Sequence, residues 1–484
     1  MLRGGVWLYA SSMINNLTGY FYWLIISSIT GPETIGIVSA IAGLSILVTG
    51  ILSLGTNMGV QRFLGKAIGK NRRDELSTYF WSSLILTTIV FGIASSVLLV
   101  LGLYGYSIIN LSPSMLIFSA VLTLAAINLI PISLLQSLLR TDLMFIMSLI
   151  GGTLRIATGL TLVFMGWGWV GAAIGYLCPA LVNLIVGMLF SLKNVIPKPT
   201  ISLSAIQDIL KAGVARWLPT TITLIGYRLG VLMVFAYIGA TETGLYYIAS
   251  AIAGAITMVS MSTIALLLPF LSSLQNGRKR ACFRVLKLCL ALILPPSVFV
   301  IVYPQFILSL LGSEYVVASP ILFTLLLAIV PDIIVGAVGN LVYAYGYYIL
   351  VLLIGLAANI PRVVLYYPLV MKYGGWGTAL SSVTGSFIGL IMALVVARRI
   401  GFKLEWRLLG KILILPITTG TLLWLLRLDW WIGIFILLAN YLLYLKLRIL
   451  TKSDIIEIAS VLKLEPLLKS VYDKYGGIVD KLVG

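Results

Sequence analysis

Apolar runs of about 20 residues, each long enough to cross a lipid bilayer, follow one another along the chain to about residue 450. Of the 484 residues, 60% are hydrophobic and 10% are charged, whereas charged residues make up about 25% of an ordinary soluble protein. The runs are continuous, whereas the strands of a membrane β-barrel alternate apolar and polar residues. The sequence therefore predicts an all-α polytopic membrane protein.

The runs predict about fourteen transmembrane helices joined by short loops. An even number of spans places both chain termini on the same side of the membrane. The expected spans are residues 5–29, 35–60, 77–103, 114–138, 143–166, 169–192, 212–238, 243–272, 282–311, 320–346, 347–371, 376–398, 408–427 and 429–450.

Lysine and arginine are distributed very unequally over the loops that this topology defines. The side of the N-terminus holds 28 of the 33 basic residues, and the other side holds only Lys372 and Arg427. Because cytoplasmic loops are rich in Lys and Arg, both termini are predicted to be cytoplasmic, in a multi-pass protein of the cell membrane. We attribute the net charge of +18 to topology and expect no nucleic-acid partner.

The residue types exclude several kinds of site. Histidine is absent, and Cys178, Cys282 and Cys289 are scattered, so the sequence predicts neither a metal site nor a disulfide framework. We expect no cofactor. A membrane glycosyltransferase or phosphatase acting on polyprenol lipids would need acids or histidines at a membrane face, and the short outer loops carry only four acids. The chain is therefore predicted not to be an enzyme.

The two halves of the chain repeat the same features in the same order. SAIAG occurs at 39–43 and 250–254, and each copy follows a turn with glycine at both ends, GPETIG at 31–36 and GATETG at 239–244. The offsets between all paired features lie between 206 and 211 residues. The further pairs are the basic loops GKNRR (69–73) and NGRKR (276–280), the turns GWVGAA (168–173) and GGWGTA (374–379), and Arg155 with Arg362.

The repeat predicts two pseudo-symmetric six-helix lobes. Because six is even, both lobes have the same orientation, as in transporters built from parallel repeats that move around a cavity at the bilayer midplane. The predicted organisation is an N-lobe (1–195), a linker (196–208), a C-lobe (209–400), two further spans (401–450) and an amphipathic tail (451–484) on the inner membrane surface.

Four charged residues fall inside predicted spans, where charges are costly and mark functional sites by default. Arg155, Arg228, Arg362 and Asp332 each lie eleven or twelve residues from an outer turn or from Pro320. At 1.5 Å per residue this depth is about 16–18 Å, near the middle of a core about 30 Å thick. The layer carries a net charge of about +2 and needs a watery cavity or an anionic ligand.

A guanidinium group is a forked donor that suits phosphate. An alternative is that the arginines bind carbonyl groups or Asp332 and hold helices together, and for the repeated Arg155 and Arg362 both interpretations stand. The repeat does not explain Arg228 or Asp332, which favours a function for each. Asp332 is predicted to be a counter-ion or a proton- or sodium-coupling site. The predicted substrate-binding residues are Arg228, Arg155, Arg362, Asn15 and Asn16.

The GPETIG turn, the basic loop KNRRDEL, the two lobes and the two extra spans resemble the polysaccharide-type flippases of the multidrug, oligosaccharidyl-lipid and polysaccharide exporter superfamily. The resemblance covers about residues 1–450. It implies that a phosphate- or diphosphate-linked, lipid-linked oligosaccharide crosses from the cytoplasmic to the outer leaflet while its lipid tail stays among the membrane lipids. We expect the chain to act as a monomer.

The multidrug exporters of the same superfamily are the alternative. They use a proton or sodium gradient and carry an essential acid in the first helix or at the start of the second lobe, which suits organic cations. Here the first span has no acid, and the seventh span carries Arg228. The residues therefore favour an anionic substrate.

Overall fold

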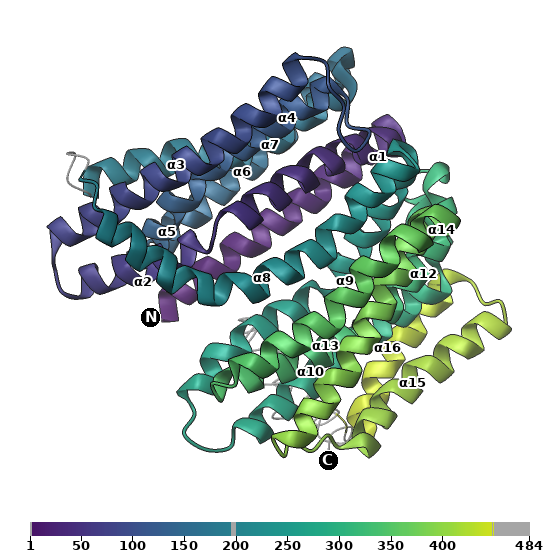
Figure 1. Ribbon diagram of the computed structural model, residues 1–484. Helices are drawn as coiled ribbons and strands as arrows, with labels where there is room; N and C mark the ends of the chain where they lie inside the picture. Colours follow the sequence, from purple (N-terminus) through teal and green to yellow (C-terminus); the bar gives the residue numbers. More distant parts are fainter. Residues whose placement is uncertain (1, 195–199, 448, 450–484) are drawn as a thin grey trace, which may run out of the picture. The chain divides into compact units, whose positions relative to one another are not determined.

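The structure is a computed structural model that describes residues 2–194, 200–447 and 449 (Figure 1). Within these ranges the chain is almost entirely helical, and its only β-type pairing is an isolated bridge between Ile108 and Leu111. The predicted all-α fold is confirmed. The predicted amphipathic tail, 451–484, lies outside the described residues.

Nine stretches of the described chain are long and apolar enough to cross a membrane. Three of these stretches hold two spans each: α1 (Leu2–Leu52), α6 with α7 (Thr141–Leu162 and Gly168–Asn194), and α14 (Tyr348–Arg399). With α9 (Ala240–Ser273) and α16 (Trp430–Lys446), the helices are consistent with fourteen spans.

The remaining helices are shorter or hold one span each. They are α2 (Thr56–Gly69), α3 (Arg73–Leu103), α4 (Pro113–Ala125), α5 (Leu129–Ser137), α8 (Leu203–Tyr237), α10 (Arg278–Val302), α11 (Pro304–Ser309), α12 (Ser319–Leu327), α13 (Ile329–Ala344) and α15 (Trp406–Leu425), with the short segments η1 (Ala126–Asn128), η2 (Val163–Trp167) and η3 (Ser313–Ala318).

Glycines make the turns at which successive spans reverse direction. Gly31 has φ 72° inside α1, a left-handed value that other residues rarely adopt. Gly168 (φ 51°, ψ −130°) and Gly374 (φ 57°, ψ −136°) share one unusual conformation, and they are the equivalent glycines of the GWVGAA and GGWGTA turns. The two copies of the repeat thus build the same turn, while the lobe boundaries themselves stay a prediction.

The prediction of a second span over 35–60 is wrong at its C-terminal end. The helix α1 ends at Leu52, and Leu54 (φ 46°) and Gly55 (φ 72°) then turn the chain before α2 begins. A hydropathy pattern does not register such a turn, because the apolar residues continue across it. The helix α2 is separate, and one face of it is buried through Val60 and Leu64.

Two compact units make up the chain. Unit 1 comprises Met1–Ala251, Leu311–Val317 and Asn359–Ser382, and unit 2 comprises Ile252–Leu310, Ala318–Ala358 and the chain from Val383 onward. Unit 1 therefore contains all of residues 1–195 together with parts of the second repeat copy.

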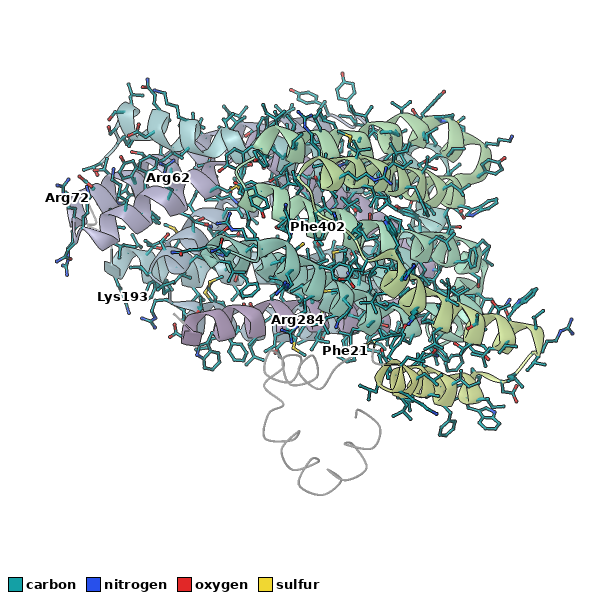
Figure 2. The ribbon with its side chains drawn as sticks, turned by 90° about the horizontal axis from the view of Figure 1, so that it is seen from below. Phe21, Arg62, Arg72, Lys193, Arg284 and Phe402 are labelled. Atoms are coloured by element: carbon teal, nitrogen blue, oxygen red, sulfur yellow. The ribbon has the colours of Figure 1, made fainter. Side chains whose placement is uncertain are left out.

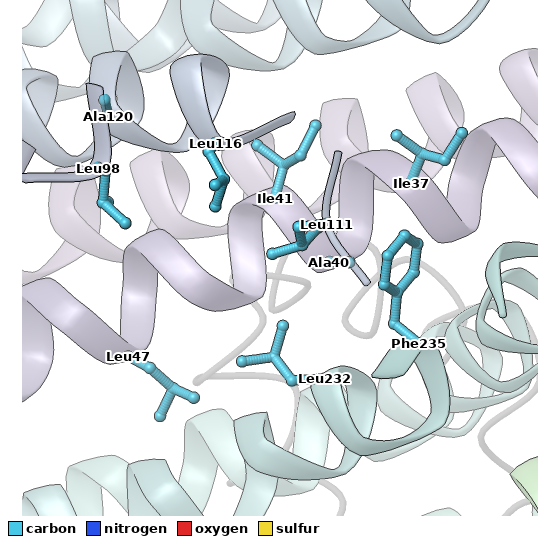
Figure 3. Packing of buried hydrophobic residues seen from close by; sticks show 10 residues of the cluster. All are labelled: Ile37, Ala40, Ile41, Leu47, Leu98, Leu111, Leu116, Ala120, Leu232 and Phe235. Carbon is cyan, nitrogen blue, oxygen red and sulfur yellow. The ribbon is translucent and has the colours of Figure 1, made fainter. Parts of the chain in front are cut away.

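Within unit 1, the second half of α1 lies along α8 (Figure 1). Gly36, Gly43 and Gly50 are spaced by seven residues along α1. A Cβ atom on Gly50 would collide with the Leu224 side chain of α8, and one on Gly36 with the backbone of Ala240 at the start of α9. Small residues allow such a close approach of helices in a membrane. The packing continues through apolar side chains of α1, α3, α4, α8 and the connection between α3 and α4 (Figure 3), namely Ile37, Ala40, Ile41, Leu47, Leu98, Leu111, Leu116, Ala120, Leu232 and Phe235.

The two repeated turns also contact each other inside unit 1. A Cβ atom on Gly36 would meet the carbonyl oxygen of Ala240, and one on Gly244 would meet the carbonyl oxygen of Pro32. The contact is reciprocal, because the last glycine of each turn packs against the backbone of the other turn. The glycines of GPETIG and GATETG are therefore required by backbone packing.

Candidate functional site

Arg155 lies in the middle of α6 and is only 9% exposed. Its guanidinium carbon is 5.6 Å from the centre of the Tyr176 ring, and a Cβ atom on Gly19 would lie 2.9 Å from its Nη1 atom. The Nε atom of Arg155 is buried and has no hydrogen-bond partner. No salt bridge joins Arg155 to an acid within the described part of the chain. Arg155 is thus a buried cation without a compensating charge.

Arg362 is the repeat equivalent of Arg155 and is held by its surroundings. It lies in α14 and is 1% exposed. Its Nη1 donates to Oδ1 of Asn359 at 3.3 Å, and its Nη2 donates to the carbonyl oxygen of Ser382 at 3.3 Å. The guanidinium carbon also lies 4.2 Å above the Tyr227 ring. These contacts fit the predicted alternative, in which an arginine binds carbonyl groups and joins helices.

One residue pair contributes to the different surroundings of the two arginines. Asn359, the amide partner of Arg362, corresponds to Gly152 in the first repeat copy at the same offset as the two arginines. A Cβ atom on Gly152 would lie 2.6 Å from Oγ1 of Thr18, so the space for a side chain is already filled there. The first copy therefore offers no amide group to Arg155.

Arg228 lies in α8, is half-buried, and carries the second charge of the candidate site. The hydroxyl of Tyr247 interacts electrostatically with both Arg228 and Arg155. The Trp23 ring lies between two tyrosines, with centroid distances of 5.4 Å to Tyr247 and 5.9 Å to Tyr176. Three aromatic rings from α1, α7 and α9 thus form a wall beside two arginines, all of them inside unit 1.

No carboxylate of unit 1 lies in the middle of a span. The acids of its described residues are found at helix starts, turns and loops, and those with contacts bind groups such as Arg72, Arg140 and the backbone of Gly375. Since isolated charges are costly inside a membrane, the three arginines favour a ligand that brings negative charge. The acids are Glu33, Asp74, Glu75, Asp142, Asp208, Glu242 and Glu314.

The structure does not gather every predicted residue at this site. Asn15 and Asn16 are exposed on α1, and no hydrogen bond of their side chains is described. Asp332 belongs to unit 2, where it lies in the first turn of α13 after a break between α12 and α13. Its role as counter-ion or coupling site stays a prediction.

Sequence reasoning missed the aromatic wall. Trp23, Tyr176 and Tyr247 are far apart along the chain, and tyrosine is common in it. The pair Gly152 and Asn359 could have been found, because the repeat offset already aligned them.

The basic loops are arranged as the positive-inside pattern predicts for one unit. Arg62, Arg72 and Lys193 lie at the same end of unit 1 (Figure 2). The guanidinium of Arg72 is bound to the carboxylate of Glu75, and that of Arg140 to Asp142 at 3.0 Å. The orientation of this end toward the cytoplasm stays a prediction.

The fold and the charged, helix-lined site define a multi-span membrane protein with the architecture of a transporter. The family profile described as "Polysaccharide biosynthesis protein" matches residues 40–320, which is more than half of the chain. The chain belongs to this family. The comparison with curated proteins finds no match.

Solved structures share the fold at low sequence identity. The lipid II flippase MurJ in its inward closed conformation superposes with a TM-score of 0.75 at 14% identity, covering 91% of this chain and 98% of that one. An inward-facing multidrug resistance MATE family transporter gives 0.61 at 16% identity, covering 82% and 97%. A transporter of the same superfamily from Pyrococcus furiosus gives 0.55 at 16% identity, covering 82% and 94%. The expected resemblance to the polysaccharide branch of this superfamily is confirmed.

Proposed function

We propose that this protein is a flippase that moves a lipid-linked oligosaccharide, joined through phosphate or diphosphate, from the cytoplasmic to the outer leaflet. The observation that carries the proposal is the buried Arg155, for whose guanidinium group no hydrogen bond or salt bridge is described, in a unit whose described spans have no carboxylate at mid-depth. The family of the chain and the MurJ-like fold support the same function. In this function the protein is a transporter and catalyses no bond cleavage.

The site offers the chemistry that such a head group needs. The Tyr247 hydroxyl interacts electrostatically with Arg155 and Arg228, so a phosphate beside that hydroxyl would be attracted by the charges of two guanidinium groups. A phosphate also supplies the negative charge that the spans of unit 1 lack. The rings of Trp23, Tyr176 and Tyr247 would cover the apolar face of a sugar next to the phosphate.

Movement of the head group requires that helices part and close around it. In the proposed cycle the two repeat copies move so that the protein opens alternately to the cytoplasmic and to the outer side of the membrane, while the lipid tail stays in the bilayer. The glycine-lined contact between α1 and α8 is the candidate for the contact that opens, because small residues of α1 pack there against leucine side chains of α8 and no ion pair between the two helices is described. Asp332 is the proposed site for a coupling proton or sodium ion.

Flipping of a fluorescent lipid-linked oligosaccharide in proteoliposomes tests the proposal. Loss of one charged hydrogen-bond partner is worth about 1.5–3 kcal/mol, so Arg155→Gln and Arg228→Gln should each slow flipping by about 10- to 150-fold. Lys372→Gln, which alters an exposed residue near a helix turn, is the matched control and should flip at the wild-type rate. Wild-type rates in both arginine variants, with normal folding, would overturn the assignment of the site.

The multidrug exporter is the other candidate, supported by the fold similarity to MATE transporters. The same proteoliposomes, loaded with an organic cation and given a proton or sodium gradient, distinguish the two functions. Cation efflux without oligosaccharide flipping would establish the exporter. If flipping depends on a gradient, Asp332→Asn should abolish that dependence, and an unchanged dependence would remove Asp332 as the coupling site.

A further inference from the structure

Unit 2 contains a pocket of about 730 Å³ where three helix ends meet. It lies at the start of α10, at the connection between α13 and α14, and at the end of α14. We call it the tyrosine pocket, because Tyr345, Tyr347 and Tyr348 line it together with Lys279 and Arg399. Since helix ends in a membrane protein lie near the lipid head groups, the pocket faces the interfacial region.

The tyrosines of this pocket are held in place by a third basic residue. Arg278 donates from Nη1 to the carbonyl oxygen of Ala344 at 2.9 Å and from Nε to that of Leu274 at 2.8 Å. Its guanidinium carbon lies 5.5 Å from the centre of the Tyr345 ring. Arg278 therefore fastens the loop before α14 to the start of α10.

The rings also support one another. Tyr345 and Tyr347 stack with their centroids 6.2 Å apart, and Tyr343 meets Tyr348 edge to face at 4.9 Å. Gly346, with φ 82°, makes the turn that allows this arrangement. The pocket is a built feature of unit 2, with phenol groups beside two basic side chains.

The charge of the tyrosine pocket is not compensated within the described residues. Its lining contains Lys279 and Arg399 and no carboxylate. The structure describes two salt bridges, and neither of them includes these two residues. An anion in the pocket would therefore meet two basic side chains without displacing an acid.

The equivalent loop in the first repeat copy differs from the tyrosine pocket in having acidic residues. There a pocket is lined by 71–75, which include Asp74 and Glu75, and Glu75 forms a salt bridge with Arg72. At the repeat offset, Ala281 and Cys282 stand in place of these two acids. The second copy has kept the basic residues and lacks the acids that neutralise them in the first.

We propose that the tyrosine pocket binds a phosphate group at the membrane surface, independently of the substrate site in unit 1. The chemistry that supports this is two basic side chains beside tyrosine hydroxyls, which can donate hydrogen bonds to phosphate oxygens. The phosphate can belong to the head group of an anionic lipid or to a free phosphate compound. The lipid is the source that the position at the helix ends favours.

The test is binding of short-chain phosphatidic acid, inorganic phosphate and short-chain phosphatidylcholine to the purified full-length protein, measured by calorimetry. Two basic residues near a lipid surface contribute about 2 kcal/mol, so Lys279→Gln/Arg399→Gln should weaken phosphatidic acid binding by about 30-fold. Arg72→Gln/Arg73→Gln, in the equivalent loop, is the matched control and should change it by less than about twofold. Phosphatidylcholine, which has no net charge, should bind weakly to all variants.

Each outcome decides the proposal. Tighter binding of phosphatidic acid than of inorganic phosphate assigns the pocket to a lipid head group, and equal binding of the two assigns it to a soluble phosphate compound. Absence of both kinds of binding to the wild-type protein overturns the proposal, as does an equal loss in the pocket and control variants. If the double variant unfolds, Lys279→Gln alone, checked for folding by thermal denaturation, should still weaken binding by about fivefold.

Discussion

Arg155 and Arg362 occupy the same position in the two repeat copies, yet their surroundings differ. Arg362 donates hydrogen bonds to Asn359 and Ser382 and lies over the Tyr227 ring. Arg155 lies beside Tyr176, and no hydrogen bond of its guanidinium group is described. A buried Nε atom without a hydrogen-bond partner is common to both arginines, so the difference lies at their Nη atoms. The two repeat copies therefore keep an arginine at the same position and surround it with different contacts.

One cause of the difference is a single position. Asn359 supplies an amide oxygen in the second copy, and Gly152 supplies nothing in the first, where Thr18 occupies the space. We infer that Arg362 is fixed as a helix-joining residue and that Arg155 is left available to an anionic ligand.

The largest effect is expected for Arg362→Ala. The substitution removes two hydrogen bonds from a charged donor, and these are worth about 1.5 kcal/mol each at the lower end of the usual range. Thermal or denaturant unfolding in detergent should show a loss of about 3 kcal/mol. Unchanged stability would show that Arg362 does not join the helices.

Arg155→Gln should have the opposite profile. Its stability should change by less than about 1 kcal/mol, because no described hydrogen bond is broken and a buried charge is removed. Flipping per folded molecule should fall by about 10- to 150-fold. A fall in stability as large as that of Arg362→Ala would indicate that Arg155, like Arg362, joins helices.

Asn359→Ala makes the second copy resemble the first. Arg362 loses its amide acceptor, so stability should fall by about 1–2 kcal/mol, while flipping per folded molecule stays near the wild-type rate. Denaturation and the flipping assay on one preparation measure both quantities. A large loss of flipping with full stability would place Asn359 at the substrate site instead.

The smallest effect is expected for Tyr176→Leu. A partly buried cation–π contact is worth about 0.5–1 kcal/mol, so substrate binding should weaken by about two- to fivefold. Tyr176→Phe keeps the ring and is the control, which should stay close to wild type. If both variants bind equally well, the ring does not position Arg155.

The sequence was sufficient for the features that depend on composition and spacing. It predicted the helical membrane fold, the repeated turns at Gly31 and Gly374, and the equivalence of Arg155 and Arg362. The second span was predicted to end too far along the chain, because the left-handed turn at Leu54 and Gly55 does not change the hydropathy pattern.

The rest of the site depends on tertiary contacts. The wall of Trp23, Tyr176 and Tyr247 exists only because α1, α7 and α9 meet. The different contacts of the two arginines could not be predicted either, because two arginines at equivalent positions of a repeat can have different neighbours in the folded chain. Arg155 and Arg362 are the same residue type and differ in their burial and hydrogen bonding.

The most direct test of the account is the affinity for a polyprenol-linked oligosaccharide with its phosphate compared with the same glycolipid without it. The wild-type protein should prefer the phosphorylated form by at least about tenfold, and Arg155→Gln should reduce this preference to less than about twofold. Asn359→Ala, which alters the other arginine's partner, should keep the wild-type preference. An undiminished preference for phosphate in Arg155→Gln would contradict the central claim that Arg155 binds the phosphate.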